Sequence, residues 1–535
     1  MKYVSVLAAL SGSVAGRYTR IKLLTASSLG RSFRLLSPNN IKCEERNLTV
    51  CSALHFILYT SYFLFILQMN EKNHQQCLEK LLWATEQLEV EVSPTQLSKI
   101  AQLIVKTMNG SWRYFHSTKH IFEVGGSTDA IEVLAALFHD IVYVQIDGSV
   151  NFNLTYYLAS FIEEDRGELF IRKPSELPSD SSFEIVAAIF DLVPGQVLLP
   201  LAGQNEFLSA VVAAKVLESF LNSKLIIQIA ACIEATVPFR SSSESGLSPS
   251  ELLYQRLIST SNQFNLQLSD EDIIQTVQRA VRVANRDVGG FASPSSAVFL
   301  AGTWSLLPET NHNLQKSGSY TVRDYRLAIQ KMAGFMNFLT PELVFRQFQG
   351  EPDDQIYQGL VEQAKKNIEV ARLYLESKLV TNAILEALSL RLGQDVSLAI
   401  MMGELPNSGV SVGRLGDSFP DLLKPYQPTT ELEIEVLHLL EVGRSNGNTY
   451  DLKNSPLTTF VVKYIGFDEI RQLKVRSQEF FQGTISAEDF LANCNTDMTK
   501  IIINEVIKLL DNRKAALLNP WQELPHHFAT SSNIE

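Results

Sequence analysis

The hydrophobic pattern after residue 70 is the feature that most constrains the fold. From there onward, apolar side chains recur at three- and four-residue spacing, and alternating patterns typical of strands are few. This spacing puts the apolar side chains on one face of a helix, where they bury against other helices. We therefore predict an all-α protein. At 535 residues the chain can form several cores, so its stability need not depend on disulfides or metals.

Residues 1–69 differ in composition from the rest of the chain. They contain eight Lys/Arg and two Asp/Glu, and an apolar segment at 53–69 closes them. Three interpretations stay open: translation that starts at Met69, a membrane anchor, or a targeting peptide. We expect a cytoplasmic protein, or a membrane-anchored one if 53–69 is translated and retained, and we expect membrane contact only in that second case.

Charge and cysteine content narrow the classes of partner. The formal net charge is -12, and after residue 69 the chain has 38 basic and 56 acidic side chains. Such a body repels polyphosphate backbones, so we expect no nucleic acid polymer as a partner, whereas a small anionic, phosphate-containing substrate stays open. The five cysteines form no CxxC pair, which argues against a disulfide framework or a zinc ribbon and indicates a reducing compartment. Oligomerisation stays open.

Turn-rich segments divide the predicted helices. The stretch 353–392 is near heptad spacing, and we expect a single long surface helix there. The segment 403–428 is rich in Gly, Ser, Pro and Asp, which indicates a linker. The tail from Pro525, with its two histidines, is expected to be frayed. We predict an atypical segment at 1–69, a helical domain at 70–350, a long amphipathic helical stretch at 351–402, a linker at 403–428 and a C-terminal helical region at 429–535.

Three of the nine histidines fall within 24 residues. His116 and His120 are four residues apart, so a helix would put both on one face. His139 and Asp140 follow near the end of a predicted helix that opens at Thr128-Asp129 and runs to about Tyr143. Imidazole and carboxylate are common ligands of catalytic transition metals. The alternative is structural, with a buried histidine bonded to a backbone carbonyl and an aspartate that caps the helix.

The segments 113–120 and 134–143 resemble the HD superfamily of metal-dependent phosphohydrolases. The resemblance is to a bacterial subgroup with the elements Arg-x-x-His-x-x-x-His, Phe-His-Asp and Asn-Glu-x-x-Ser-Ala, the last of which matches residues 205–210. It covers about residues 95–300 and implies an HD-domain helical bundle with an additional C-terminal helical region. In relatives the Asn-Glu element follows the His-Asp pair closely, which implies that residues 144–203 are an insertion.

The resemblance also implies a metal-ligand set of His, His-Asp and a distant Asp. It assigns His120, His139 and Asp140 to the first three positions. Asp287 is the best candidate for the fourth, because it lies near the end of a later predicted helix. The alternative is an ordinary acid at a helix end, although an acid is unfavourable there. His and Asp ligands suit Mn, Fe, Co, Ni or Zn. Weaker substitutes for Asp287 are Asp191 and Asp272.

The implied function is metal-dependent hydrolysis of a small phosphoester or nucleotide-like substrate by a metal-activated water. His116 or Glu206 would position or deprotonate that water, and with Asp140 they form the predicted catalytic set. Two other interpretations stay open: a non-catalytic HD-fold nucleotide-binding sensor or scaffold, and an all-α structural protein with a chance motif. The side chains expected to bind substrate are Arg113, Lys119, Asn205, Arg240 and Arg286.

Overall fold

A computed structural model describes residues 48–315, 319–393, 396–403, 414–417, 419–448 and 450–518, with side chains from Gln68 onward. These residues are predominantly helical, which confirms the all-α prediction. The predicted frayed tail, and residues 404–413 and 418 of the predicted linker, lie outside them.

The chain divides into two units, Met1–Ile66 and Leu67–Glu535. Helix α3 (Leu48–Gln87) passes from the first unit into the second. It includes the apolar segment for which a membrane anchor was one interpretation. Among the described helices, none combines the length and the hydrophobicity that a membrane crossing requires.

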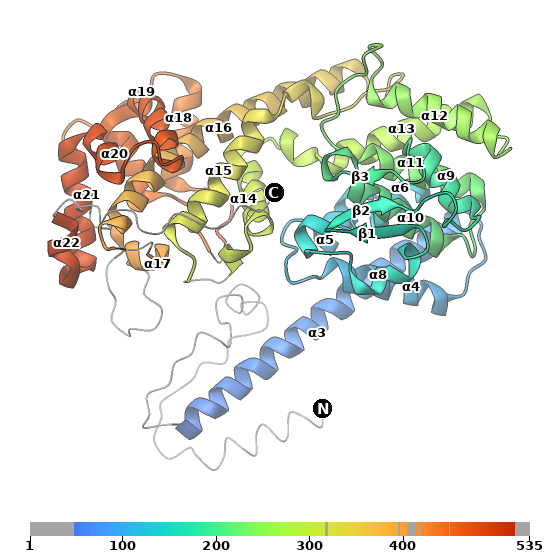
Figure 1. The fold of residues 1–535 in the computed structure, drawn as a ribbon, viewed down its shortest axis with the longest axis horizontal. Helices are drawn as coiled ribbons and strands as arrows, with labels where there is room; N and C mark the ends of the chain where they lie inside the picture. Colours follow the sequence, from blue (N-terminus) through green and yellow to red (C-terminus); the bar gives the residue numbers. More distant parts are fainter. Residues whose placement is uncertain are drawn as a thin grey trace. The chain divides into compact units, whose positions relative to one another are not determined.

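The first apolar core is formed by residues between 77 and 284, together with Phe348. Helix α11 runs through it and contacts α6, α9, α10, α12 and α13, as Figure 1 shows in green and cyan. Helix α4 begins after Ser93, whose side chain caps it, and ends before Asn109. The helices of this core after α3 are α4 (Pro94–Met108), α5 (Thr118–Val124), α6 (Ala130–Phe138), α7 (Val144–Asp147), α8 (Phe152–Leu158), α9 (Ser181–Ile189), η4 (Pro200–Ala202), α10 (Gln204–Leu217), α11 (Ser223–Ala235), α12 (Pro249–Gln263) and α13 (Asp270–Asp287).

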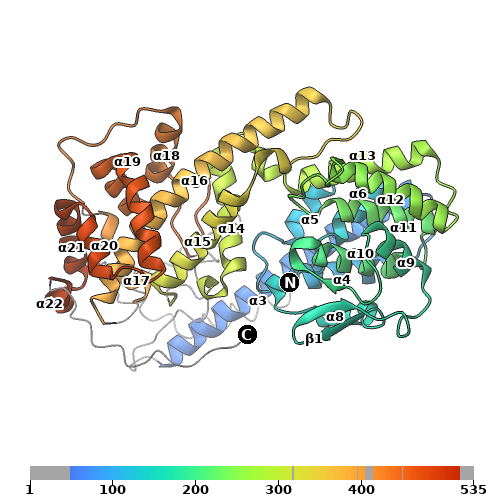
Figure 2. The same cartoon turned by 45° about the horizontal axis from the view of Figure 1, so that its top comes forward.

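A small antiparallel sheet departs from the sequence expectation. The strands β1 (Ile162–Asp165), β2 (Glu168–Ile171) and β3 (Val197–Leu198) pair in that order, and β1 lies beside α8 in Figures 1 and 2. Helix α8 ends at Leu158, and β1 begins at Ile162. The reason is the turn at Arg166-Gly167, where both residues have positive φ (52° and 85°), because two such residues form the tight turn of a hairpin.

The stretch 144–203 contributes to the first core. Phe161 stacks on Phe183 with ring centroids 4.4 Å apart, and Phe183 in turn packs on Phe207 of α10. That residues 144–203 are an insertion stays a prediction.

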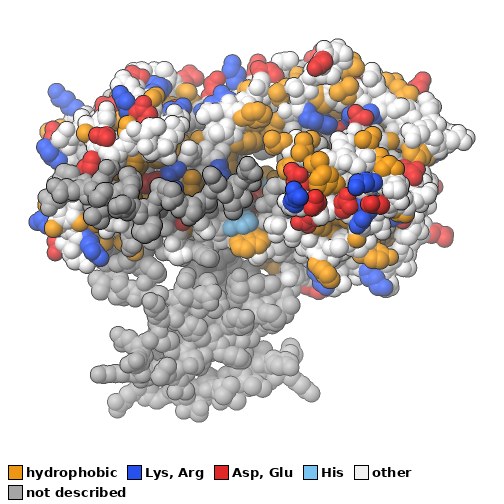
Figure 3. Space-filling view, in the orientation of Figure 1, with side chains coloured by type: hydrophobic (Ala, Val, Ile, Leu, Met, Phe, Trp, Pro, Cys, Tyr) orange, Lys and Arg blue, Asp and Glu red, His pale blue; other side chains and the backbone are white. Residues whose placement is uncertain are grey.

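Basic and acidic side chains are interspersed over the face of the molecule that Figure 3 shows.

The second apolar core lies within residues 299–517. Helix α16 runs through it in contact with α15, α18, α19 and α20 (Figure 2). It is the single long helix expected at 353–392, but from Ala364 onward it is largely buried rather than on the surface, because apolar residues such as Leu373, Tyr374 and Leu375 cover several of its faces. The elements of this core are α14 (Ser296–Thr310), η6 (His312–Gln315), α15 (Val322–Phe338), η7 (Pro341–Leu343), α16 (Asp354–Leu390), α17 (Leu398–Met401), η8 (Leu415–Asp417), α18 (Glu431–Val442), α19 (Pro456–Phe481), α20 (Ala487–Asn493), α21 (Thr496–Leu509), η9 (Asp511–Arg513) and α22 (Lys514–Leu518).

The chain passes from the first core to the second near residue 290. The short helix η5 (Gly289–Ala292) follows α13 and contacts α13, α14 and α16. Most apolar residues of 299–345 pack in the second core, although the sequence led us to expect them over the first. The predicted domain boundaries themselves stay predictions.

Candidate metal centre

Four side chains converge at the ends of three helices. One ligand atom from each of His120, His139, Asp140 and Asp287 lies within 4.8 Å of the others. His120 Nε2 is 2.9 Å from Asp287 Oδ1 and 3.3 Å from Asp140 Oδ2, and His139 Nε2 is 3.4 Å and 3.0 Å from the same two atoms. The fold therefore brings together the three ligands implied by the sequence resemblance and the distant aspartate.

His139 and Asp140 lie where α6 stops. Asp129 caps the start of the helix as predicted, accepting hydrogen bonds from the N–H groups of Ile131 and Glu132. The end is at Phe138, five residues before the expected Tyr143. His139 is therefore the C-cap residue of α6, and Asp140 lies beyond the end of the helix.

Arg113 explains why α6 ends early. Its guanidinium donates to the carbonyls of Asp140 (2.6 Å) and Ile141 (3.2 Å) and forms a bidentate pair with Asp147 (3.1 and 2.7 Å). Side chains thus replace the backbone bonds that further helix would supply. The expectation that Arg113 binds substrate is not supported, because its side chain is fully buried and engaged.

The donor set fits a divalent transition metal. The Nδ1 of His139 lies 2.8 Å from the carbonyl of Ala136, so we assign Nδ1 as the N–H donor, which leaves the lone pair on Nε2. His139 Nε2 and Asp140 Oδ2 are buried, and although they lie 3.0 Å apart, neither is in a well-aligned hydrogen bond with any described residue. Buried polar atoms are rarely unpartnered, and a cation bound between them would satisfy both.

The electrostatics of the centre follow from burial and charge. Burial lowers the pKa of His120, but the hydrogen bonds and charges of Asp140 and Asp287 outweigh it and raise that pKa to about 9. The pKa of His139 is also raised, against its burial, by the same two carboxylates. Burial raises the pKa of Asp287, but His120 and His139 prevail and lower it to about 2. Asp140 has a lowered pKa for the same reason.

His116 is close to the centre but not in the way its spacing suggested. Residues 113–117 are not helical, and α5 begins only at Thr118. The Oε1 of Glu309 instead accepts hydrogen bonds from the N–H groups of residues 114, 115 and 116 (2.6, 2.7 and 3.1 Å). Its Oε2 lies 2.7 Å from His116 Nδ1. The His116 ring is 5.8 Å from that of His120 between centroids.

Glu309 is a candidate functional residue that the sequence did not reveal. It lies on α14, 193 residues after His116, and its side chain is only 1% exposed. A carboxylate at Nδ1 fixes the imidazole tautomer and leaves Nε2 as the basic nitrogen. No signal in the segment around Glu309 could have linked it to His116.

The Asn-Glu element contributes differently at its two positions. Asn205 is not the N-cap of α10. It accepts a hydrogen bond from the Val144 N–H (3.0 Å) and donates to Gln145 Oε1 (2.7 Å), so it holds the start of α7. Glu206 is partly buried, and burial, assisted by the charges of Asp140 and Asp287, raises its pKa to about 7.

A glycine sets the approach of α10 to the centre. Gly203 has φ of +91°, and a Cβ there would lie 2.7 Å from Val237 Cγ2. The left-handed conformation and this close contact both favour glycine. The first turn of α10, with Glu206, can therefore lie against the residues that follow α11.

Two more residues expected to bind substrate, Lys119 and Arg286, make contacts within the fold. Lys119 is 81% exposed and pairs with Glu123 on the surface of α5. Arg286 donates to the Val124 carbonyl (2.6 Å) and to Glu132 (2.6 Å), so it joins α13 to α5 and α6 and positions all three ligand-bearing helices. Asp191 and Asp272 are both exposed and outside the cluster.

Arginines surround one carboxylate beside the centre. Arg240 and Arg256 both bond Glu234 Oε1 (2.6 and 2.5 Å). Arg346, which the sequence did not single out, donates to the Val237 carbonyl. Burial and repulsion by Arg240 lower the pKa of Arg346 to about 9, although Glu234 and Asp287 act in the opposite direction. Three guanidinium groups against one carboxylate give this arginine cluster (Arg240, Arg256 and Arg346) an excess of positive charge.

Comparison with protein families, with curated proteins and with solved structures finds no match. The account of this centre therefore depends on its own geometry.

Proposed function

We propose that the chain is a metal-dependent phosphohydrolase that acts on a small phosphoester or nucleotide-like substrate. The observation that carries the proposal is the convergence of two histidines and two aspartates, with two of their ligand atoms buried and in no well-aligned hydrogen bond with a described residue. The resemblance of segments 113–120 and 134–143 to the HD superfamily supports the reaction type.

The chain supplies a general base next to the metal ligands. A bound divalent metal would lower the pKa of a coordinated water and polarise a phosphoryl oxygen. His116 Nε2 would take the proton when the water oxygen bonds to phosphorus and the ester P–O bond breaks. Glu309 would stabilise the resulting imidazolium, as a carboxylate does in other His-carboxylate pairs. Glu206 is the second candidate for this proton.

The arginine cluster supports an anionic substrate. The charge of Glu206 helps to raise the pKa of Arg240. The charge of Asp287 acts against the lowering of the Arg346 pKa. The cluster therefore lies within electrostatic range of the centre. Arg346 Nη1 and Arg240 Nε are buried without a partner among the described residues. Planar guanidinium groups bind phosphate oxygens in pairs.

A metal-loaded activity screen tests the proposal. Purified chain loaded in turn with Mn, Fe, Co, Ni and Zn would be assayed on a generic phosphodiester and a nucleotide panel. We expect turnover with at least one metal, and loss of turnover in His139→Ala and Asp140→Ala. Asp270→Asn, an exposed acid on α13, serves as the control. Loaded wild type that hydrolyses none of these compounds would refute the proposal.

The alternative is a non-catalytic nucleotide-binding sensor or scaffold with an HD-like fold. One observation favours it: Arg113, Arg286 and Asn205, all expected to bind substrate, are engaged in internal hydrogen bonds. The same screen separates the two, because a sensor would bind a nucleotide from the panel without turnover in any metal form.

A further inference from the structure

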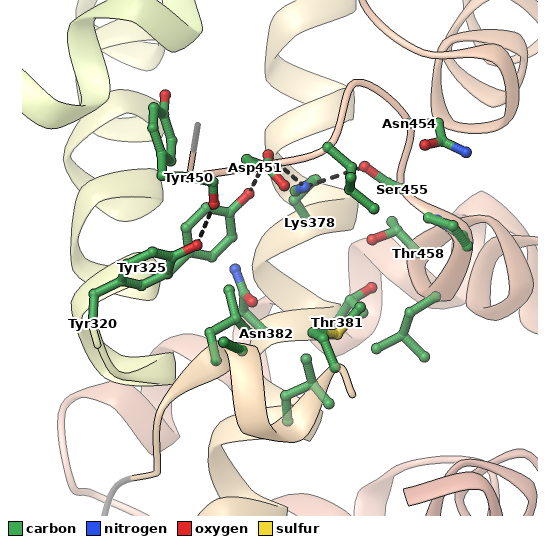
Figure 4. A pocket seen from close by; sticks show the side chains of 17 residues that line it. Tyr320, Tyr325, Lys378, Thr381, Asn382, Tyr450, Asp451, Asn454, Ser455 and Thr458 are labelled. Atoms are coloured by element: carbon green, nitrogen blue, oxygen red, sulfur yellow. Dashed lines mark hydrogen bonds and ion pairs between the residues drawn. The ribbon is translucent and has the colours of Figure 1, made fainter. Parts of the chain in front are cut away.

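A cavity lies in the second core, on residues that contribute nothing to the metal centre. It encloses about 80 Å³, and one water needs roughly 10–15 Å³, so a ligand of several atoms fits. Figure 4 shows side chains from α15, α16 and the segment that leads into α19 around it. Its walls are partly apolar, with Leu385, Leu398 and Met402, and partly polar.

Positive charge exceeds negative charge around this cavity. Lys378 on α16 lines it, and the buried Arg444 lies behind, with its guanidinium 4.2 Å from the Trp304 ring centroid. Asp451 is the carboxylate that faces both cations, at 3.4 Å from Lys378 and 3.2 Å from Arg444. Its Oδ2 also accepts from Trp304 Nε1 and from the Tyr325 hydroxyl (both 2.7 Å), so this oxygen is fully engaged by the surrounding donors.

Lys378 retains donor capacity toward the cavity. Its ammonium bonds Asp451 and Ser455 Oγ, the latter at 3.1 Å. Since an ammonium has three N–H bonds, one remains without an acceptor among the described residues. The side chain is 8% exposed, and a buried cation with a spare donor favours an anion nearby.

The start of α19 presents unpaired N–H groups at the same cavity. Residues 454–458 line it, and the helix begins at Pro456 after Ser455, whose side chain does not cap it. The N–H groups of Leu457 and Thr458 are in the first helical turn and have no partner within the helix. A helix N-terminus carries partial positive charge and attracts anions.

Asn382 gives an independent indication of a ligand. It is 4% exposed, and its Nδ2 has no hydrogen-bond partner among the described residues. Figure 4 shows its amide turned toward the side of the cavity that carries Tyr320 and Tyr325. An unpartnered buried amide is costly, and an acceptor in the cavity would remove that cost.

We propose that this cavity is a binding site for a small oxyanion, a carboxylate or a phosphate, held by Lys378, Asn382 and the N-terminus of α19. The site is separate from the metal centre. Its occupation does not depend on whether the chain hydrolyses a phosphoester.

Calorimetry on the full, metal-free chain tests the site, with inorganic phosphate, selenate and acetate as probes. We expect at least one probe to bind. Asn382→Leu removes the amide donor, and Asn382→Asp adds a negative charge in nearly the same shape. Both should weaken binding roughly ten- to a hundred-fold, as expected for loss of a hydrogen bond to a charged group. Lys366→Met, an exposed lysine on the same helix, should leave it unchanged. Preference for acetate over phosphate would identify the ligand as a carboxylate.

A crystal of the wild-type chain soaked in selenate locates the anion without any variant. The proposal expects a selenium anomalous peak in the cavity, between Lys378 and Asn382. It is overturned if none of the three probes binds wild type at millimolar concentration, if binding survives in both Asn382 variants, or if the selenium lies only elsewhere.

Discussion

The candidate ligand side chains of His139 and Asp140 are oriented by contacts that other atoms of the same two residues make. His139 Nε2 is left with its lone pair because Nδ1 lies against the Ala136 carbonyl. Asp140 is held through its own backbone carbonyl by Arg113. The sequence motif identified which side chains take part but not these supports, because the bonds depend on backbone that leaves the helix earlier than its apolar pattern indicates.

Metal affinity should rise with pH. The pKa of His120 in the metal-free protein is about 9, so His120 must lose a proton to bind a metal below that pH. We expect the affinity for Zn²⁺ or Mn²⁺ to increase up to about pH 9, by roughly tenfold per pH unit for each proton released. Competition titrations with a chelating dye at pH 6, 7.5 and 9 measure this. A pH-independent affinity would contradict the ligand role of His120.

The stability of the metal-free protein should fall with pH over the same range. The folded pKa of His120, about 9, exceeds its usual value of 6.5. The stability contributed by the charged imidazole is therefore fully present below pH 6.5 and is lost as the pH rises to 9. We expect a loss of roughly 1–3 kcal/mol in the free energy of unfolding. Denaturant titration at pH 6.5 and 9 measures it, and His120→Gln, the matched control, should show a smaller fall.

Arg113 should control metal affinity without touching the metal. Arg113→Met removes the donors that hold the Asp140 and Ile141 carbonyls, and loss of such support costs roughly 10–100-fold in metal affinity. Lys119→Met, which changes an exposed cation on α5, should leave affinity unaltered. Equal affinities in wild type and the folded Arg113 variant would show that the turn after α6 keeps its shape by other means.

At the scale of elements, α14 reaches the metal centre from the second core. Its residue Glu309 bonds three consecutive backbone N–H groups and His116. This explains why 113–117 is not a helix, although the spacing of His116 and His120 suggested one. Periodicity predicts an element when local contacts decide its structure, and here the deciding contact comes from 193 residues away.

Glu309→Gln tests the link between α14 and His116, the proposed catalytic base. The amide keeps the size of the side chain but cannot stabilise an imidazolium, so we expect kcat to fall roughly 10–100-fold with metal content unchanged. The double variant with His116→Gln should lose no more activity than His116→Gln alone, because Glu309 acts only through His116. Glu342→Gln, an exposed acid in the second core, is the control. Additive losses in the double variant would argue against a shared role.

At the scale of the whole molecule, the centre draws residues from both parts of the chain. The first core supplies the four candidate metal ligands, whereas Glu309 and Arg346 follow the crossing near residue 290. The helical class and the start of α6 could be predicted from local patterns, whereas the grouping of His120, His139, Asp140 and Asp287 was implied by the resemblance to the HD superfamily. The second core's contribution could not be predicted, because neither residue lies in a motif and both act through contacts distant in sequence.

Arg346 should affect the substrate and not the metal. We expect Arg346→Met to raise KM for a phosphate-containing substrate roughly tenfold or more, because a charge-assisted hydrogen bond to the substrate is lost. Arg323→Met, elsewhere in the second core, is a suitable control. Steady-state kinetics with parallel metal analysis separates the two effects. A fall in metal content instead of a rise in KM would assign Arg346 to the support of Asp287.

The metal content of the purified chain tests the central claim most directly. After loading and gel filtration, elemental analysis should find about one equivalent of a transition metal per wild-type chain, as expected for a single four-ligand site. Asp270→Asn should retain the metal, whereas Asp287→Asn and His139→Ala should lose most of it while remaining folded. Wild type that holds no transition metal, or variants at Asp287 and His139 that hold as much as wild type, would contradict the account.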